Sequence, residues 1–312
     1  MFIPDRAGNA PEYAIAVRGL TKRFGRRLAI DDLTLSVRPG EICGLAGANG
    51  GGKSTSLRLL AGLLAPDAGE GLVLGCDLLR GTRRVRHAVG YLAQRSTLYP
   101  TLSVRENLRF RAAVFGSSDA RRAAEQQIEV FGLAEISGAS VGQLSAGWTR
   151  QVELAATLIH GPRLLLLDEP TAGLDPAARQ LIWRSLISVA AQGTAIVLST
   201  HDFVEAQRCA HILLLSEGRI RASGSPQEVV AQFDALALIV SGPQVLSLAD
   251  RLPGRSVLAA YPVGNDIRLV VSADARGKTD ALLTAHGCRS TPASLTLEEA
   301  ALIVAHRAGA ST

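Results

Sequence analysis

The chain has 312 residues, of which 47% are hydrophobic and 20% are charged, and its formal net charge is +5. This length and composition exclude an intrinsically disordered chain and leave room for one large domain and one small domain. The positive charge permits an anionic partner, but the densest basic cluster, Arg83-Arg84-Val85-Arg86, is typical of a solvated helix face. We therefore expect no nucleic acid partner.

The cysteines and the apolar runs further limit the classes of protein to which the chain can belong. Cys43, Cys76, Cys209 and Cys288 lie far apart and form no metal-binding or redox pattern, so we expect reduced thiols in a cytosolic protein. Apolar runs such as Leu164–Leu167 are far shorter than the roughly 18 residues that a membrane helix needs. No signal peptide pattern opens the chain. A protein that does not cross a bilayer by itself is expected.

The first 13 residues contain proline, glycine and polar residues, which predicts a flexible tail at 1–13. An Arg38-Pro39-Gly40 turn then separates two short strands, and leucines at helical spacing follow residue 56. The elements expected here are strands at 14–17, 33–37 and 41–46 and a helix at 56–64.

The segment between that last strand and that helix, GANGGGKST, matches G-x-x-x-x-G-K-[ST]. Glycines let the backbone curl tightly and aim several N–H donors at a phosphate tail, and the start of the helix adds the positive end of its dipole. Lys53 supplies a charge that reaches the terminal phosphates, and the hydroxyl of Ser54 is a ligand for Mg²⁺. The expected contacts of this triphosphate cradle are Gly47, Ala48, Asn49, Gly50, Gly51, Gly52, Lys53, Ser54 and Thr55.

The middle of the chain is predicted to be helical. The clearest helices are expected at 104–115 and 120–131, and a further helix is expected from Gly147 to about residue 159. An apolar strand at 164–167, buried on both faces, then leads into Asp168-Glu169-Pro170. Asp168 can hold Mg²⁺, usually through water, and Glu169 can polarise an attacking water, as phosphoryl transfer requires. An Asp-Glu pair that only caps a turn is the alternative, and the nearby phosphate cradle argues against it.

The remaining strands and helices alternate, which predicts a parallel α/β sheet, until the pattern changes near Ala235. A helix with proline in its first turn is expected at 176–191, followed by strands at 195–199 and 212–215. Beyond Ala235 we expect strands at 236–240, 256–261 and 267–271 with a hairpin at Gly264-Asn265, helices at 245–252, 279–286 and 297–307, and one further strand. This part contains no glycine-rich or metal-binding motif.

Leu144-Ser145-Ala146-Gly147-Trp148 precedes the Asp168 strand, and here the chain resembles the ATP-binding subunits of ABC transporters, whose signature is LSGGQ. In that family the serine and the second glycine bind the γ-phosphate held by the other subunit of a head-to-tail dimer, which implies this role for Ser145 and Gly147. Ala146 and Trp148 replace Gly and Gln. The methyl group of Ala146 costs little at a negative φ and strains the turn at a positive one, so weaker hydrolysis is an open alternative. Taken alone, the pentapeptide is equally consistent with a helix capped by Ser145.

Other positions resemble further motifs of the family. Phe24 resembles the aromatic residue that stacks on adenine, although a core phenylalanine is the alternative. Gln94 resembles the glutamine that senses Mg²⁺ and faces the membrane partner, and Asp175 resembles the aspartate that couples the two sites across the dimer. His201 resembles the histidine that contacts the γ-phosphate. The resemblance covers residues 14–233, with Ala48 where the family commonly has proline.

The resemblance implies a P-loop NTPase fold of the ABC ATPase class, with a parallel core sheet and an N-terminal antiparallel β part. The ATPase domain is expected at 14–234, with a helical subdomain at about 95–150, and a small α+β accessory domain at 235–312. ATP and Mg²⁺ are the implied ligands, with Glu169 and His201 catalytic and Ser54, Gln94 and Asp168 at the metal. The implied partners are a second copy in the ATP-bound state and a separate transmembrane permease, on the cytoplasmic face of the cell membrane.

A finer resemblance is to the ATPase subunits of ABC-2 type exporters of drugs, lipids or polysaccharides. It depends on Gly90–Gln94 with Leu98-Tyr99-Pro100, on Gly147-Trp148, and on the closing segment Leu297-Glu298-Glu299-Ala300. The alternatives are a soluble ABC ATPase acting on ribosomes, which usually carries two cassettes, a DNA-repair ATPase, which needs a longer insertion, and a non-catalytic nucleotide sensor. A regulatory or dimerising role is expected for residues 235–312.

Overall fold

The computed structural model describes residues 12–80, 82–242, 245 and 257–309. Almost all of the tail expected at 1–13 lies outside these residues, and so does the helix expected at 245–252 except for its first residue.

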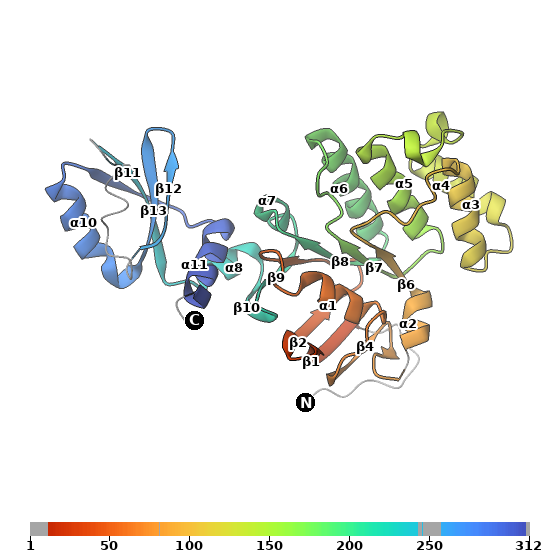
Figure 1. Cartoon of the computed structure of the whole chain (residues 1–312), viewed down its shortest axis with the longest axis horizontal. Helices are drawn as coiled ribbons and strands as arrows, with labels where there is room; N and C mark the ends of the chain where they lie inside the picture. Colours follow the sequence, from red (N-terminus) through yellow and green to blue (C-terminus); the bar gives the residue numbers. More distant parts are fainter. Residues whose placement is uncertain (1–11, 81, 243–244, 246–256, 310–312) are drawn as a thin grey trace.

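A six-stranded sheet forms the centre of the larger part of the molecule, with the strand order β10-β9-β3-β8-β7-β6 (Figure 1). Five of its strands are parallel, and β10 pairs with β9 in the antiparallel direction. The strands are β3 (Ile42–Ala46), β6 (Val89–Leu92), β7 (Leu164–Asp168), β8 (Ala195–Thr200), β9 (His211–Ser216) and β10 (Arg219–Gly224). Every residue of β7 is buried, as a continuous apolar run in a sheet covered on both faces requires. The predicted parallel sheet is confirmed.

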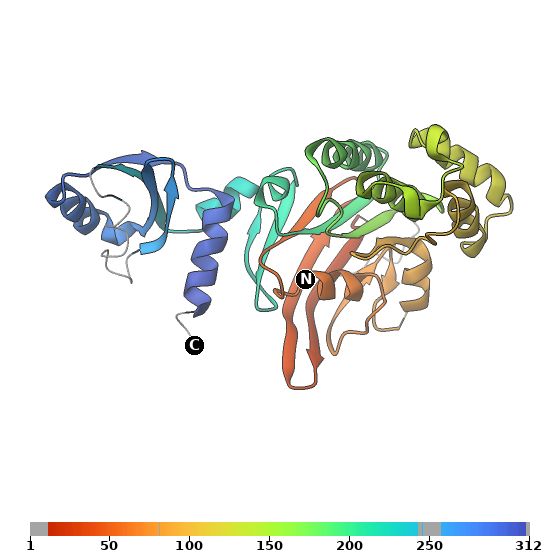
Figure 2. The ribbon, with the colours of Figure 1, turned by 45° about the horizontal axis from the view of Figure 1, so that its top comes forward.

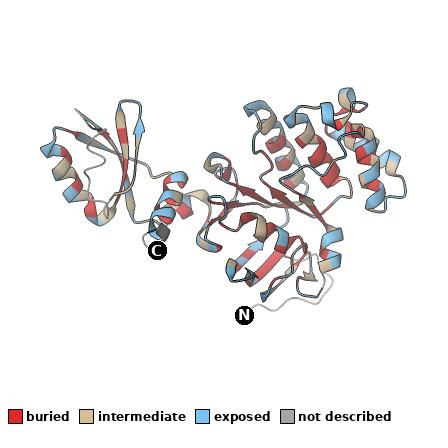
Figure 3. Ribbon diagram, in the orientation of Figure 1, coloured by how far each residue is buried: buried red, intermediate tan, exposed pale blue. Residues whose placement is uncertain are grey.

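A second, antiparallel sheet with the order β2-β1-β4-β5 covers one side of the core together with α1 (Lys53–Leu60). Its strands are β1 (Ile15–Phe24), β2 (Arg27–Val37), β4 (Ala68–Val73) and β5 (Cys76–Asp77), and the short helix α2 (Thr82–Ala88) leads on to β6. Figure 3 shows the buried residues concentrated on the central strands and on the faces of the elements that cover them. The antiparallel part expected at the N-terminal end is therefore present.

The other side of the sheet is covered by helices, which include the expected helical subdomain. Figure 2 shows α3 and α4 at the end of the molecule far from the C-terminal part. The helices are α3 (Val104–Val114), α4 (Ala120–Val130), α5 (Ala146–Leu158), α6 (Pro176–Ala191) and α7 (Phe203–Ala206), with short 3₁₀ turns at Ala134–Ile136 and Val141–Gln143. Ser103 and Glu106 form a capping box at the start of α3, and Asp119 caps α4. These polar caps explain why the joints between the helices are polar.

The C-terminal part contains a four-stranded antiparallel sheet with the order β12-β13-β11-β14 and a buried cluster of its own. Its elements are β11 (Ala235–Ser241), β12 (Val257–Val263), β13 (Asp266–Ser272), a 3₁₀ turn at Ala273–Ala275, α10 (Arg276–Ala285), β14 (Arg289–Ala293) and α11 (Leu297–Gly309). The expected α+β character is confirmed, and β12 and β13 form a hairpin at the predicted place.

The last helix, α11, returns to the larger part of the molecule. It packs beside α8 (Pro226–Ala231) and β9, and its residues Leu297 and Val304 belong to the same buried cluster as Leu214 and Val229. Figure 1 shows α11 between the C-terminal sheet and the larger part. The division at residue 235 stays a prediction, to which the structure adds that the final helix packs against both parts.

Candidate nucleotide site

The glycine-rich loop leaves the carboxyl end of β3 and turns directly into α1. Gly47, Gly50 and Gly52 have φ values of 143°, 79° and 105°, which L side chains rarely adopt. A Cβ atom on Gly47 would lie 2.2 Å from the carbonyl oxygen of Leu215, and one on Gly52 would lie 2.7 Å from Cδ1 of Ile30. The loop is thus pressed against its neighbours on one side, and glycine is required for it to form. The helix begins earlier than the leucine spacing predicts, at Lys53, because Gly52 is its N-cap.

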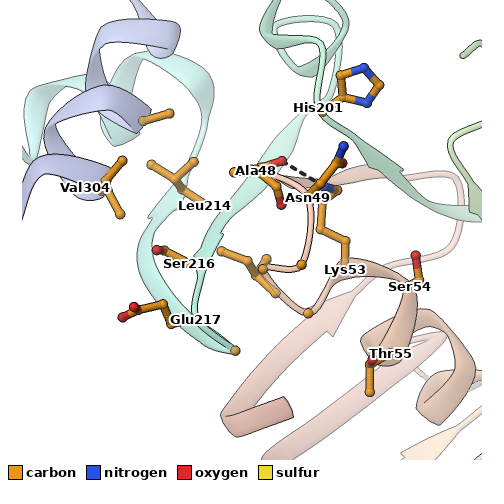
Figure 4. Close-up of a pocket in the computed structure, with 18 of the residues that line it drawn as sticks. Ala48, Asn49, Lys53, Ser54, Thr55, His201, Leu214, Ser216, Glu217 and Val304 are labelled. Atoms are coloured by element: carbon orange, nitrogen blue, oxygen red, sulfur yellow. Dashed lines mark hydrogen bonds between the residues drawn. The ribbon is translucent and has the colours of Figure 1, made fainter. Parts of the chain in front are cut away.

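Lys53 lies within this loop. Its ammonium group donates hydrogen bonds to the carbonyl oxygens of Gly47, at 2.8 Å, and Ala48, at 3.1 Å. Figure 4 shows the side chain turned back toward Ala48, with Ser54 and Thr55 following on α1. Burial lowers the pKa of Lys53, and the nearby carboxylates of Glu169 and Asp168 oppose that shift. A buried cation surrounded by a curled backbone fits an anionic phosphate tail.

Asp168, at the end of β7, is held by two hydroxyl groups. Its Oδ1 accepts hydrogen bonds from Ser54 at 2.9 Å and from Ser199 at 2.7 Å. The side chain is almost wholly buried. A carboxylate next to a hydroxyl is a set of hard oxygen donors of the kind that Mg²⁺ prefers. Gln94 and Ser54 line one cleft, so the glutamine lies on the same side of the molecule as this pair. The residues present therefore fit the expected metal.

Glu169 and His201, the two expected catalytic residues, lie side by side. Oε1 of Glu169 is 3.2 Å from Nδ1 of His201, with 10% of the glutamate side chain and 53% of the histidine side chain exposed. Glu169 has a φ of 48°, an unusual value for a residue with a side chain, and its backbone N–H donates to Oγ of Ser199. This turn directs the glutamate toward the histidine, which follows the neighbouring strand β8.

One cleft of about 1120 Å³ collects most of the predicted residues. The glycine-rich loop, Gln94, Glu169 and His201 line it, and so does Phe24. Phe24 is 51% exposed at the tip of the β1–β2 hairpin, which excludes the alternative of a core phenylalanine. An exposed aromatic ring beside a phosphate cradle is suited to stacking on a nucleobase.

Four predicted residues do not line this cleft: Asp168, which is hydrogen-bonded to the lining residue Ser54, and Ser145, Gly147 and Asp175. Ser145 caps α5 by accepting a hydrogen bond from the N–H of Trp148, and Asp175 caps α6. A Cβ on Gly147 would lie 2.7 Å from Cβ of Ala178, so glycine allows the starts of α5 and α6 to approach closely.

Ala146 opens α5 and has no positive φ. Its methyl group therefore causes no strain in the signature turn, and the structure gives no backbone reason for weaker hydrolysis.

Sequence reasoning missed several residues around the site. Ser199 supports both Asp168 and Glu169, and Arg150 binds the backbone on both sides of Glu169. Glu298, Ala301, Leu302, Val304 and Ala305 of α11 border the cleft beside β9. For Arg150 a signal existed, because Arg150 and Glu153 are opposite charges three positions apart on a helix. No sequence pattern indicates that α11 reaches the cleft.

Comparisons with known proteins agree with this geometry. Residues 30–172 match the family model described as ABC transporter. The Nod factor export ATP-binding protein I of Paraburkholderia xenovorans (strain LB400) is 41% identical over 246 residues, which are 78% of this chain and 81% of that protein. The probable multidrug ABC transporter ATP-binding protein YbhF of Escherichia coli (strain K12) is 40% identical over 229 residues, 72% of this chain, but the chain spans only 39% of its length.

Solved structures give the same result. An ATP-binding subunit of an ABC transporter superposes with a TM-score of 0.63 and 30% identity, covering 70% of this chain and 92% of that one. The cbiO1 protein of Clostridium perfringens, part of the ABC transporter complex cbiONQ, superposes with a TM-score of 0.64 and 28% identity. The match covers 71% of this chain and 92% of that one. Within the described residues, no helix is long and apolar enough to span a membrane.

Proposed function

The chain belongs to the family of ATP-binding subunits of ABC transporters, and from this premise we propose that it binds and hydrolyses ATP to power a separate membrane permease. The observation that carries the proposal is one cleft lined by the glycine-rich loop and by the Glu169–His201 pair, to which Asp168 is joined through its hydrogen bond with Ser54. Each of these is a part that phosphoryl transfer from a nucleotide needs.

The bound triphosphate lies along the glycine-rich loop, where backbone N–H groups and the start of α1 face its oxygens. Lys53 exchanges its contacts with Gly47 and Ala48 for the terminal phosphates, and Phe24 stacks on the base. Ser54 and Asp168 hold Mg²⁺, with Gln94 beside them. When bound, the metal neutralises charge on the phosphate oxygens.

Glu169 orients the water that attacks the γ-phosphorus, and His201 contacts the γ-phosphate from the neighbouring strand. As the new P–O bond forms, the bond to the leaving ADP oxygen breaks, and Glu169 accepts the proton that the water loses. The 3.2 Å contact between Glu169 and His201 supports this assignment, since it keeps both groups at one end of the cleft.

A second copy of the chain completes the site in this proposal. Ser145 and Gly147 lie at the start of α5, outside the cleft of their own chain, which supports a contact with the γ-phosphate held by another molecule. We propose a head-to-tail dimer in the ATP-bound state, with Asp175 near the contact between the two copies. Gln94 and the helices after it would meet the permease at the cytoplasmic face of the membrane.

Export is the proposed direction of transport. Two of the similar proteins are named for multidrug transport and for Nod factor export, and the match to the second covers 81% of that protein. These names favour a transporter over the alternative of an ATPase acting on ribosomes. The choice of cargo belongs to the permease in this proposal.

The Glu169→Gln variant tests the hydrolytic assignment. The amide keeps the size of the side chain but cannot act as a base, so turnover should fall by about 10²-fold or more, while ATP-dependent dimers accumulate. ATPase assays and size-exclusion chromatography with ATP would measure the two effects. Glu217→Gln is the matched control, because Glu217 also borders the cleft with a φ of 51° but pairs with Arg221. Wild-type turnover by Glu169→Gln would remove Glu169 from its role.

The Lys53→Ala variant tests the phosphate cradle separately. Without the ammonium group, the loop loses its only lysine and the charge that reaches the terminal phosphates, so ATP affinity should fall by at least about 10-fold. Equilibrium binding of a fluorescent ATP analogue would measure this. Unchanged affinity would show that the nucleotide does not bind along this loop.

A further inference from the structure

Arg150 is a charged side chain inside the protein that the proposed function does not use. It lies on α5, five residues after Ser145, and only 9% of its surface is exposed. A buried guanidinium is costly unless every donor is satisfied, so its partners indicate what it does.

All five N–H donors of Arg150 have a partner on or near the site. Nε donates to the carbonyl oxygen of Pro170 at 2.8 Å, and Nη2 donates to those of Asp168 and Glu169 at 3.1 and 2.8 Å. Nη1 donates to the carbonyl oxygen of Ala93 at 3.1 Å and to Oε2 of Glu153 at 2.8 Å. The guanidinium therefore joins the backbone just before Gln94 to three consecutive carbonyl groups at the end of β7.

The backbone that Arg150 binds is strained. Glu169 has a φ of 48°, a conformation that is unfavourable for a residue with a side chain and persists only where the surroundings enforce it. Two contacts enforce it here: Ser199 accepts the N–H of Glu169, and Arg150 donates to its carbonyl oxygen. The direction of the Glu169 carboxylate toward His201 depends on this backbone conformation.

We propose that Arg150 is a positioning residue that holds Glu169 in its productive conformation and links it to the helix that carries Ser145 and Gly147. The inference rests on the proposed function, because it assigns no chemistry to Arg150 itself. The hydrogen bonds from Arg150 to the carbonyl oxygens of Asp168, Glu169 and Pro170 are here called the carbonyl clamp.

The test uses two variants because removing only the arginine would leave Glu153 buried without its partner. Arg150→Lys keeps the positive charge next to Glu153 but loses the planar fork that reaches four carbonyl groups. The double variant Arg150→Met with Glu153→Met removes both charges. In each we expect kcat for ATP to fall about 10- to 100-fold, because a displacement of a catalytic group by about 1 Å has an effect of this size. The Kd for ATP should stay within about threefold of the wild-type value, because no contact of Arg150 reaches the phosphate cradle.

Gln151→Ala is the matched control on the same helix. Gln151 donates to the carbonyl oxygen of Phe131, on the side of α5 that faces the helical subdomain, and touches no catalytic segment. Its kcat should stay within about twofold of wild type, as for an ordinary loss of one hydrogen bond away from the site. Thermal unfolding of all variants separates a loss of kcat from a loss of folded protein.

The outcomes distinguish this inference from the proposed function. Loss of kcat in the Arg150 variants with ATP affinity retained supports the clamp. If Glu169→Gln is inactive while both Arg150 variants turn over like wild type, the clamp is wrong and the catalytic assignment stands. If kcat falls only in proportion to the folded fraction, Arg150 only stabilises the fold and the proposal fails. Wild-type turnover by Glu169→Gln itself would overturn the site on which both depend.

Discussion

Ser199 connects the side chain of Asp168 to the backbone of Glu169. Its hydroxyl donates to Asp168 and accepts the backbone N–H of Glu169, so one small side chain fixes a proposed metal ligand and a proposed catalytic group. Such supporting hydrogen bonds set the orientation of a ligand and affect metal affinity by about 10- to 100-fold in other proteins.

We expect the Ser199→Ala variant to need a higher Mg²⁺ concentration for ATPase activity. Without the hydroxyl, Asp168 keeps only the hydrogen bond from Ser54, so the Mg²⁺ concentration for half-maximal ATPase activity should rise about 10-fold. A titration of activity with Mg²⁺ at saturating ATP would measure this. Ser185→Ala removes a hydroxyl that bonds only to Leu181 on α6 and is the control. An identical Mg²⁺ dependence in wild type and Ser199→Ala would contradict the expected support.

At the residue scale, the sequence predicts site residues that lie in one continuous segment and misses those that the fold brings together from distant segments. The glycine-rich loop is one continuous stretch, so its residues can be named from their order alone. Ser199 and Arg150 reach Asp168 only because β7 pairs with β8 and α5 packs beside β6. Neither residue carries a spacing that indicates its contact with Asp168 or Glu169, and serine and arginine are common in many other settings.

At the scale of elements, the most accurate predictions are those of helices whose first residues carry a capping side chain or a proline. The helix α6 begins and ends where expected, because Asp175 caps it and Pro176 opens it. The strands between residues 68 and 92 are not predicted from the sequence, whereas the helix face expected at Arg83–Arg86 lies on α2. These strands are short, β4 contains two glycines and β5 has only two residues, so periodicity cannot reveal them.

The start of α11 is fastened to the C-terminal sheet by a buried carboxylate. Glu299 is fully buried, and its carboxylate accepts hydrogen bonds from Arg268, Tyr261 and Thr296. Burial alone would raise the pKa of Glu299, but the hydrogen bonds from Arg268 and from the backbone of Thr296 outweigh burial and leave the pKa below its ordinary value. This carboxylate therefore stabilises the fold in its charged form.

The sign of the pH dependence follows from that shift. A lowered pKa adds stability that is present above the ordinary value of about 4.3 and is lost as the pH falls through the lower folded value. We expect Glu299→Gln to lower the free energy of unfolding of this part by about 1–3 kcal/mol at pH 7, with a smaller difference from wild type below pH 4. Urea unfolding across this pH range would measure it. Glu298→Gln, the exposed neighbour, should change little, and equal effects of the two substitutions would contradict the assignment.

At the scale of the whole molecule, the fold class and the small C-terminal α+β part were predicted, whereas the way the two parts meet was not. Alternation of apolar runs with helical patterns identifies the layers of each part. The place where α11 docks depends on which apolar face stays uncovered on α8 and β9 after the rest has folded. That information is spread over segments distant in the chain, so no local pattern records it.

The docking of α11 also fixes the order in which the protein can be completed during synthesis. Leu214 and Val229 are made long before Leu297 and Val304, yet all four are buried in one cluster. Until α11 leaves the ribosome, that patch of the larger part is open to water and available to a chaperone. The polypeptide therefore covers this patch only after the C-terminal sheet has been synthesised.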